Sequence, residues 1–168
     1  MTIAQSLLPE FDSETTITRT LLERVPENQP DWRPHEKSMS LGHLAMHIAS
    51  LPNLAIATLA NDEFDVSPPG ATGSRTPAWT SRANALSMFD ANVKAARETL
   101  AGIPDEAMLA TWTLKRGGTT MFSIPRLAAF RNMVMNHLIH HRGQLSVYLR
   151  LNDVPLPSIY GPSADTKL

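Results

Sequence analysis

The 168-residue sequence contains no cysteine. Disulfide bonds, thiolate metal sites, iron–sulfur clusters and a cysteine nucleophile are therefore all excluded within the chain. Any metal ion that the protein binds must be held by nitrogen or oxygen ligands. A reaction that needs a thiol would have to take it from a second molecule.

The sequence also lacks an excess of charge of either sign and lacks long apolar segments. Its 15 Lys and Arg residues are balanced by 16 Asp and Glu residues, and no basic stripe indicates binding to DNA or RNA. No apolar run approaches the roughly 20 residues that span a bilayer, and the first residues lack the pattern of a secretory signal. We therefore expect a soluble, cytoplasmic, globular protein without nucleic-acid or membrane partners.

Three common catalytic motifs are missing as well: the sequence contains no HExxH, no GxSxG and no P-loop. These absences argue against a zincin protease, a serine hydrolase of the usual type and a nucleotide-hydrolysing enzyme. Carboxylates that could serve as a base, such as Glu36, Asp62, Glu63 and Asp65, lie in predicted loops, and nothing fixes them near one another. We therefore assign no residue as a catalytic acid or base.

Apolar periodicity and capping residues predict four long helices in a single domain of residues 1–168. The predicted helices cover residues 9–25, 41–61, 81–101 and 124–151. Ser40 and Thr80 are the expected N-caps of the second and third helices. Pro52 is expected to kink the second helix, because proline cannot donate a backbone hydrogen bond.

The connections between the predicted helices are long and rich in proline and glycine. Residues 62–77 are expected to be irregular, and residues 152–168 to form an extended C-terminal tail. Residues 111–123 alternate weakly around a pair of glycines, which predicts either a short hairpin or an irregular loop. The fold class that follows is all-α, a four-helix bundle with long loops.

Half of the six histidines lie in one short part of the last predicted helix. On a helical wheel His141 falls within an apolar stripe, His137 flanks it, and His140 points roughly 100° away from His141. Residues four apart lie on the same face of a helix with Cβ atoms about 5–6 Å apart. His137 and His141 can therefore offer two imidazole nitrogens to one cation.

The second predicted helix offers a third ligand. His47 lies on the edge of its apolar face between Leu44 and Leu51, whereas His43, one turn earlier, lies farther from that face. We therefore predict that His47 points inward, and that His43 is a surface residue or supports the site. In the alternative interpretation the histidines bind no metal and are core residues whose nitrogens are hydrogen-bonded to the backbone.

Two further residues of the last helix are candidates for supporting the site or lining a pocket. Gln144 lies near the metal side, where it either hydrogen-bonds a ligand or, by preference, joins two helices. Tyr148 lies on the His141 side, where it either orients a substrate or, by preference, packs with its hydroxyl satisfied. Arg142 projects away from His137 and His141 and is expected to anchor the tail or a carboxylate elsewhere.

Three segments together resemble the DinB-like (DinB/YfiT-like) family of metalloenzymes: LGHLAMHIA (41–49), NHLIHHRGQLSVYLRL (136–151) and VPLPSIYGPSAD (154–165). Their order and spacing extend the similarity over nearly the whole chain. The resemblance implies a four-helix bundle in which His47, His137 and His141 hold a divalent metal. It also implies nickel or zinc as the metal, with iron or manganese as alternatives, and a homodimer.

Two classes of function are compatible with these observations. Three neutral imidazoles leave coordination positions open, as expected of a catalytic metal centre. The first function is a metal-dependent enzyme acting on a small-molecule substrate, either a transferase that uses a low-molecular-weight thiol or a hydrolase that uses metal-activated water. The alternative is a non-catalytic, dimeric metal-binding bundle with a stress-related role.

Overall fold

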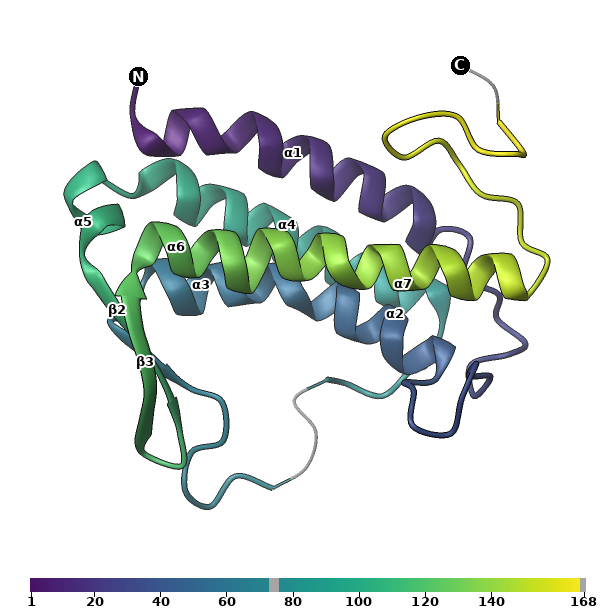
Figure 1. Ribbon diagram of the computed structural model, residues 1–168, viewed down its shortest axis with the longest axis horizontal. Coiled ribbons are helices and arrows are strands. Elements are labelled where there is room, and N and C mark those ends of the chain that lie inside the picture. Colours follow the sequence, from purple (N-terminus) through teal and green to yellow (C-terminus); the bar gives the residue numbers. More distant parts are fainter. Residues whose placement is uncertain (73–75, 167–168) are drawn as a thin grey trace.

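The computed structural model describes residues 1–72 and 76–166, and within them all helices except the short α5 form four long rods that lie side by side (Figure 1). The prediction of a helical fold is therefore confirmed in outline. The elements in chain order are α1 (Ile3–Leu22), α2 (Leu41–Ser50), the 3-10 turn η1 (Leu51–Asn53), α3 (Leu54–Leu59), β1 (Glu63–Asp65), α4 (Arg82–Gly102), α5 (Asp105–Leu109), β2 (Thr111–Arg116), β3 (Thr119–Pro125), α6 (Arg126–Phe130), the π-helical segment η2 (Arg131–Asn136) and α7 (His137–Leu151).

Helix α1 begins at Ile3 rather than at residue 9, where the sequence placed its start. The hydroxyl of Thr2 accepts the N–H of Gln5 (3.1 Å), and the Gln5 side chain accepts the N–H of Thr2 (2.9 Å). This reciprocal capping box satisfies two N–H groups that a helix start leaves without partners. Pro9 consequently lies inside the helix and not in its first turn.

Single residues determine where the second and third rods begin and where the second rod is interrupted. Ser40 caps α2 as predicted, since its hydroxyl accepts the N–H of His43 (3.3 Å). At Pro52 the rod passes through η1 before it continues as α3, because proline has no N–H to donate. The cap of α4 is Ser81 and not the predicted Thr80: the Ser81 hydroxyl accepts the N–H of Asn84 (3.0 Å).

A three-stranded sheet in the order β1–β2–β3 corrects the all-α prediction. Strands β2 and β3 form an antiparallel hairpin that turns at Gly117 and Gly118, with φ of 59° and 79°, values that glycine adopts without steric cost. Strand β1 pairs in parallel with β2, so the prediction that residues 62–77 are irregular is wrong at this strand. The Asp65 carboxylate fixes the hairpin by accepting the N–H groups of Gly117 (3.0 Å) and Gly118 (2.7 Å).

The last rod is not the continuous α-helix that the sequence predicted. Pro125 is still extended, α6 follows it, and Arg131–Asn136 are π-helical before α7 begins at His137. Single π-helical turns within α-helices occur frequently at functional sites. Here the π-helical segment ends immediately before a predicted metal ligand.

Helices α2 and α7 face each other across the apolar core. Each of them contacts the other, α2 also contacts α4, and α7 also contacts α1. Leu44, Ile48, Leu138 and Leu145 are buried in the shared core and hold the two helices together by removing apolar surface from water. None of the helices in the described part of the chain combines the length and the apolar character that a membrane crossing requires.

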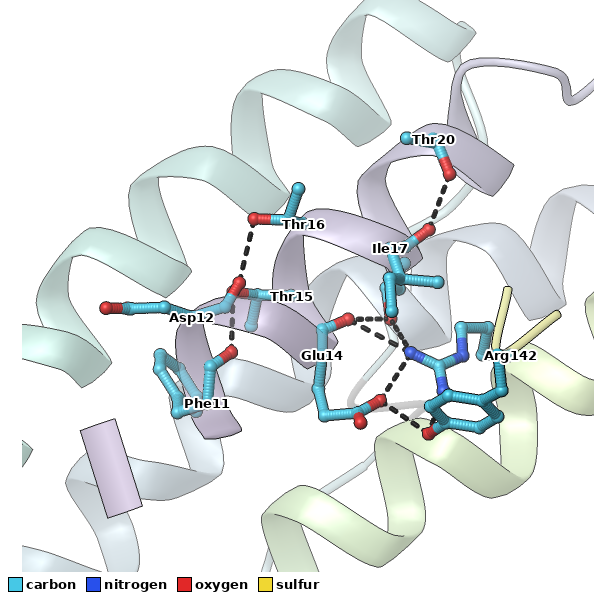
Figure 2. Close-up of polar contacts among 10 residues, drawn as sticks. Phe11, Asp12, Glu14, Thr15, Thr16, Ile17, Thr20 and Arg142 are labelled. Carbon is cyan, nitrogen blue, oxygen red and sulfur yellow. Dashed lines mark hydrogen bonds and ion pairs between the residues drawn. The ribbon is translucent and has the colours of Figure 1, made fainter. Parts of the chain in front are cut away.

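A buried ion pair joins the middle of α7 to α1 (Figure 2). Arg142 is 1% exposed and Glu14 7% exposed, and Arg142 Nη1 lies 2.6 Å from Glu14 Oε2. Tyr160, in the segment after α7, accepts a hydrogen bond from Arg142 and donates one to Glu14 (2.8 Å). Arg142 therefore anchors both a carboxylate and the tail, in agreement with the sequence prediction.

Candidate metal centre

The structure brings His47, His137 and His141 together. His47 comes from α2, His137 is the first residue of α7, and His141 lies one turn farther along α7. One ring nitrogen from each lies within 4.8 Å of the others. Because two of the residues are four apart on one helix and the third faces them from a packed neighbour, the helix–helix contact positions all three imidazoles.

Hydrogen bonds on the far side of the imidazoles orient them. His141 Nδ1 lies 2.7 Å from Gln144 Oε1, and His47 Nδ1 lies 3.2 Å from the Thr76 hydroxyl. His137 is bonded to the backbone of Met133, within η2. A carboxamide oxygen can only accept, so His141 carries its proton on Nδ1 and presents a lone pair at Nε2.

The Nε2 atoms of the three histidines face one another and lack suitable hydrogen-bond donors among the described residues. His141 Nε2 and His137 Nε2 lie 2.9 Å apart, and their rings are neutral at pH 7 because burial lowers the pKa of both. Two lone pairs at this distance repel each other unless a proton or a cation lies close to both. His47 Nε2 is buried and has no hydrogen-bond partner among the described residues.

These features fit a divalent cation. A buried nitrogen without a partner costs about 1–3 kcal/mol, and a shared cation would satisfy His47 and relieve the repulsion between the other two rings. Burial, and to a smaller degree the nearby imidazoles of His141 and His137, lower the pKa of His47 to about 4. All three rings are therefore neutral at pH 7, the form in which histidine binds metal.

A cavity of about 410 Å³ opens over His47 and His137. Its other walls come from η1, α3, η2 and the segment at β1. One edge of the three-stranded sheet therefore closes one side of the site. Thr76 lines the cavity as well as orienting His47. Two of the three imidazoles are therefore accessible to a small molecule.

The other candidate residues have different surroundings. Gln144 bonds His141, the less favoured of its two predicted roles. Tyr148 is buried, donates to the Met39 carbonyl (3.2 Å) and packs edge-on against Trp32, which agrees with its preferred packing role. His43 lines a separate hollow of about 490 Å³ with Trp79 and Thr76, one turn from His47.

The remaining histidine of α7 and the carboxylates stay outside the site. His140 is exposed, although its ring stands near that of His141. In the part of the chain that the structure describes, no carboxylate joins the group of three histidines. The sequence did not predict the roles of Thr76 and Met133. Thr76 lies in a loop and Met133 in the π-helical segment η2, and no local sequence pattern predicts that either contacts the histidines.

A helical fold in which two packed helices bring three imidazoles together defines a candidate three-histidine metal protein. The chain belongs to the DinB superfamily, whose family model matches residues 10–145. A solved DinB-like protein from Bacillus cereus is 21% identical, with a TM-score of 0.70 over 93% of this chain and 97% of that one.

A DinB-like protein from Bacillus subtilis is also 21% identical, with a TM-score of 0.69 over 92% of this chain and 96% of that one. At this level of identity the two structures establish a shared fold. No curated protein matches the chain.

Proposed function

We propose that His47, His137 and His141 hold one divalent metal ion, and that the protein is an enzyme that acts on a small molecule in the adjoining cavity. The observation that carries this proposal is the buried Nε2 of His47, which has no hydrogen-bond partner among the described residues and lies close to the imidazoles of His137 and His141. His47 and His137 also line an open cavity. A site used only to join helices would not need that opening. The cavity therefore favours catalysis over the non-catalytic alternative.

The chain's own residues determine how the metal is held. Gln144 fixes the tautomer of His141, the Met133 backbone orients His137, and Thr76 orients His47. The bound ion would supply a Lewis acid with its full +2 charge for activating water or a thiol. Imidazole ligands suit nickel, zinc and iron, of which we propose nickel or zinc, with iron or manganese as alternatives.

The reaction is either the transfer of a low-molecular-weight thiol to an electrophile or the hydrolysis of a bond. A thiol must come from solution, because the chain has no cysteine. Incubation with a thiol and a reactive electrophile, with and without metal, tests the first reaction. Equal rates in the two samples would exclude it and leave hydrolysis as the reaction to be screened.

A homodimer and a cytoplasmic location belong to the same proposal. Family membership supports the dimer, and the balanced charge with no apolar run of membrane length supports the location. Light scattering on the full chain tests the dimer. A mass equal to that of one chain would contradict it without affecting the metal site.

Elemental analysis of untagged protein, purified without added metal or chelator, tests the metal centre. We expect stoichiometric metal in the wild type, retained in His43→Ala and His140→Ala and lost in His47→Ala and His141→Ala. The first two variants are matched controls, because each removes a histidine from the same helix as a proposed ligand. A wild type that binds no nickel, zinc, iron or manganese after reconstitution would refute the proposal.

A further inference from the structure

We propose that the cavity over the histidines takes an uncharged molecule with an apolar body, and not an anionic metabolite. This inference rests on the proposed function and names the substrate class of the same site. It is carried by the chemistry of the cavity walls. None of the residues that line the cavity, all within the described part of the chain, is Asp, Glu, Lys or Arg.

The walls opposite the histidines are apolar and come from four parts of the chain. They consist of Leu51, Leu54, Ala57, Phe64, Val66 and Met133. Phe64 and Val66 are two residues apart at strand β1, so alternation along the strand directs both to the same side. Met133 completes the wall from η2. A ligand that fills this space gains by removing apolar surface from water.

Four charged side chains near β1 form two ion pairs. Glu63 and Lys115, on the strands that flank the cavity wall, form an ion pair (2.5 Å). Arg126, at the start of α6, pairs with Asp62 and also donates to the Asn61 carbonyl (3.2 Å). A carboxylate or phosphate placed against the apolar wall would therefore lose water without gaining a counterion from the side chains of that wall, which costs free energy.

The polar side chains of the lining are suited to a neutral group. The Ser50 hydroxyl donates to the His47 carbonyl (2.8 Å), and the Thr76 hydroxyl is bonded to His47 Nδ1. The Asn53 carboxamide is exposed and makes none of the hydrogen bonds found within residues 1–72 and 76–166. It can donate to or accept from a neutral polar group, but it provides no charge.

Matched neutral and anionic probes test this inference. Benzyl alcohol and benzoate have nearly the same size and shape, and differ in charge. Both are titrated into full-length protein with 13C-labelled methionine methyl groups, as purified and after chelation, and the Met133 signal is assigned with Met133→Leu. In the chelated protein we expect benzyl alcohol to shift the Met133 signal and to bind roughly tenfold or more tightly than benzoate.

A charge placed at the cavity rim gives the converse test. Asn53→Lys is expected to raise the affinity for benzoate and leave that for benzyl alcohol nearly unchanged. Asn28→Lys, at an exposed turn position away from the cavity, is the matched control and should change neither affinity. Unchanged benzoate affinity in Asn53→Lys would count against the inference.

Two outcomes in the chelated wild type would overturn the inference: benzoate binding as tightly as benzyl alcohol, or no response of Met133 to either probe. The titration of chelated protein does not depend on metal, so its outcome is independent of whether the proposed metal centre exists. Elemental analysis tests the metal centre separately. Benzoate that binds the metal-loaded protein as tightly as benzyl alcohol does would also overturn the inference, because the cavity of the loaded protein would then accept an anion.

Discussion

At the scale of single residues, the candidate site depends on which nitrogen of each imidazole carries the proton. Gln144 accepts from His141 Nδ1, and the Met133 backbone bonds His137. Both bonds leave Nε2 facing the centre as a lone pair, the arrangement that a metal ligand needs. These partners lie outside the proposed ligand set, and hydrogen bonds of this kind influence how strongly a histidine site would hold a metal.

Replacement of Gln144 by alanine is therefore expected to lower metal affinity by about 10–100-fold, the usual effect of losing a hydrogen bond to a ligating histidine. Gln144→Glu retains an acceptor for His141 Nδ1 and should bind metal at least as tightly as wild type. Competition against a chromophoric chelator measures both affinities. Because Gln144 is exposed, neither change should disturb the fold. Equal affinity in Gln144→Ala and wild type would show that the bond does not orient His141.

The stability of the metal-free protein should depend on pH through His47. Its pKa is about 4 in the folded protein, below the ordinary 6.5, because burial disfavours the charged ring. Between these values the unfolded chain binds the proton and the folded chain does not, so the free energy of unfolding falls as pH decreases from 6.5 to 4. Below pH 4 His47 contributes no further loss.

Urea unfolding of chelated protein at several pH values between 7 and 4.5 measures this dependence. His137 and His141 add to it with the same sign, because burial lowers both of their pKa values. His47→Gln, which keeps a polar side chain without a titrating ring, should lose stability less steeply with falling pH. The same slope in wild type and His47→Gln would contradict the assignment.

The sequence predicted which histidines come together at the site, but it did not predict all of the hydrogen bonds that orient them. The helical spacing of His137 and His141, and the position of His47 at the edge of an apolar face, bring these residues together once the helices pack. The bond from Thr76 to His47 spans 29 positions in the sequence, and no local pattern encodes such a contact.

At the scale of elements, a buried polar network fixes α7 relative to α1 and the tail. Arg142 follows His141 directly but projects away from the histidines toward Glu14 on α1 (Figure 2). Its Nη1 also donates to the Glu14 carbonyl (3.1 Å). The network thus sets the rotation of α7 about its axis, and with it the direction in which His141 points.

Arg142→Ala is expected to destabilise the protein by about 3–5 kcal/mol, because it leaves the buried carboxylate of Glu14 without its cation. The double variant Glu14→Leu with Arg142→Met removes both charges and should recover most of this loss. Urea unfolding curves provide the two free energies. If the double variant were as unstable as the single one, the loss would come from packing and not from an unpaired charge.

Strand β1 and segment η2 were not predicted, because local sequence patterns do not determine them. Strand β1 has only three residues, and its existence depends on pairing with β2 across some 50 positions and on the Asp65 carboxylate that accepts from the hairpin turn. Segment η2 has no proline, glycine or other local signal at its boundaries. The four rods were predictable, because apolar periodicity and capping act within a few residues.

At the scale of the whole molecule, the candidate centre lies where two rods separated by most of the chain meet. His47 belongs to the second rod and the other two histidines to the last (Figure 1). A metal ion there would tie the first third of the sequence to the last. The β1 segment covers the same place from outside, so the site, the cavity and the sheet form one unit.

Metal removal should therefore lower the stability of the entire domain. A ligand that binds only the folded state contributes RT ln(1 + [L]/Kd), or about 2.7 kcal/mol when the free ion is at 100 times Kd. For a domain of this size that corresponds to a decrease in Tm of about 5–11 °C on chelation. Calorimetric scans before chelation, after it and after re-addition of nickel or zinc measure the change.

Matched variants decide whether this stabilisation comes from the proposed centre. His140→Ala keeps all three proposed ligands and should respond to chelation as the wild type does. His47→Ala breaks the link between the two rods, so its Tm should be the same with and without chelator. A chelator effect of wild-type size in His47→Ala would place the stabilising metal elsewhere in the molecule, because two histidines on one helix cannot join α2 to α7.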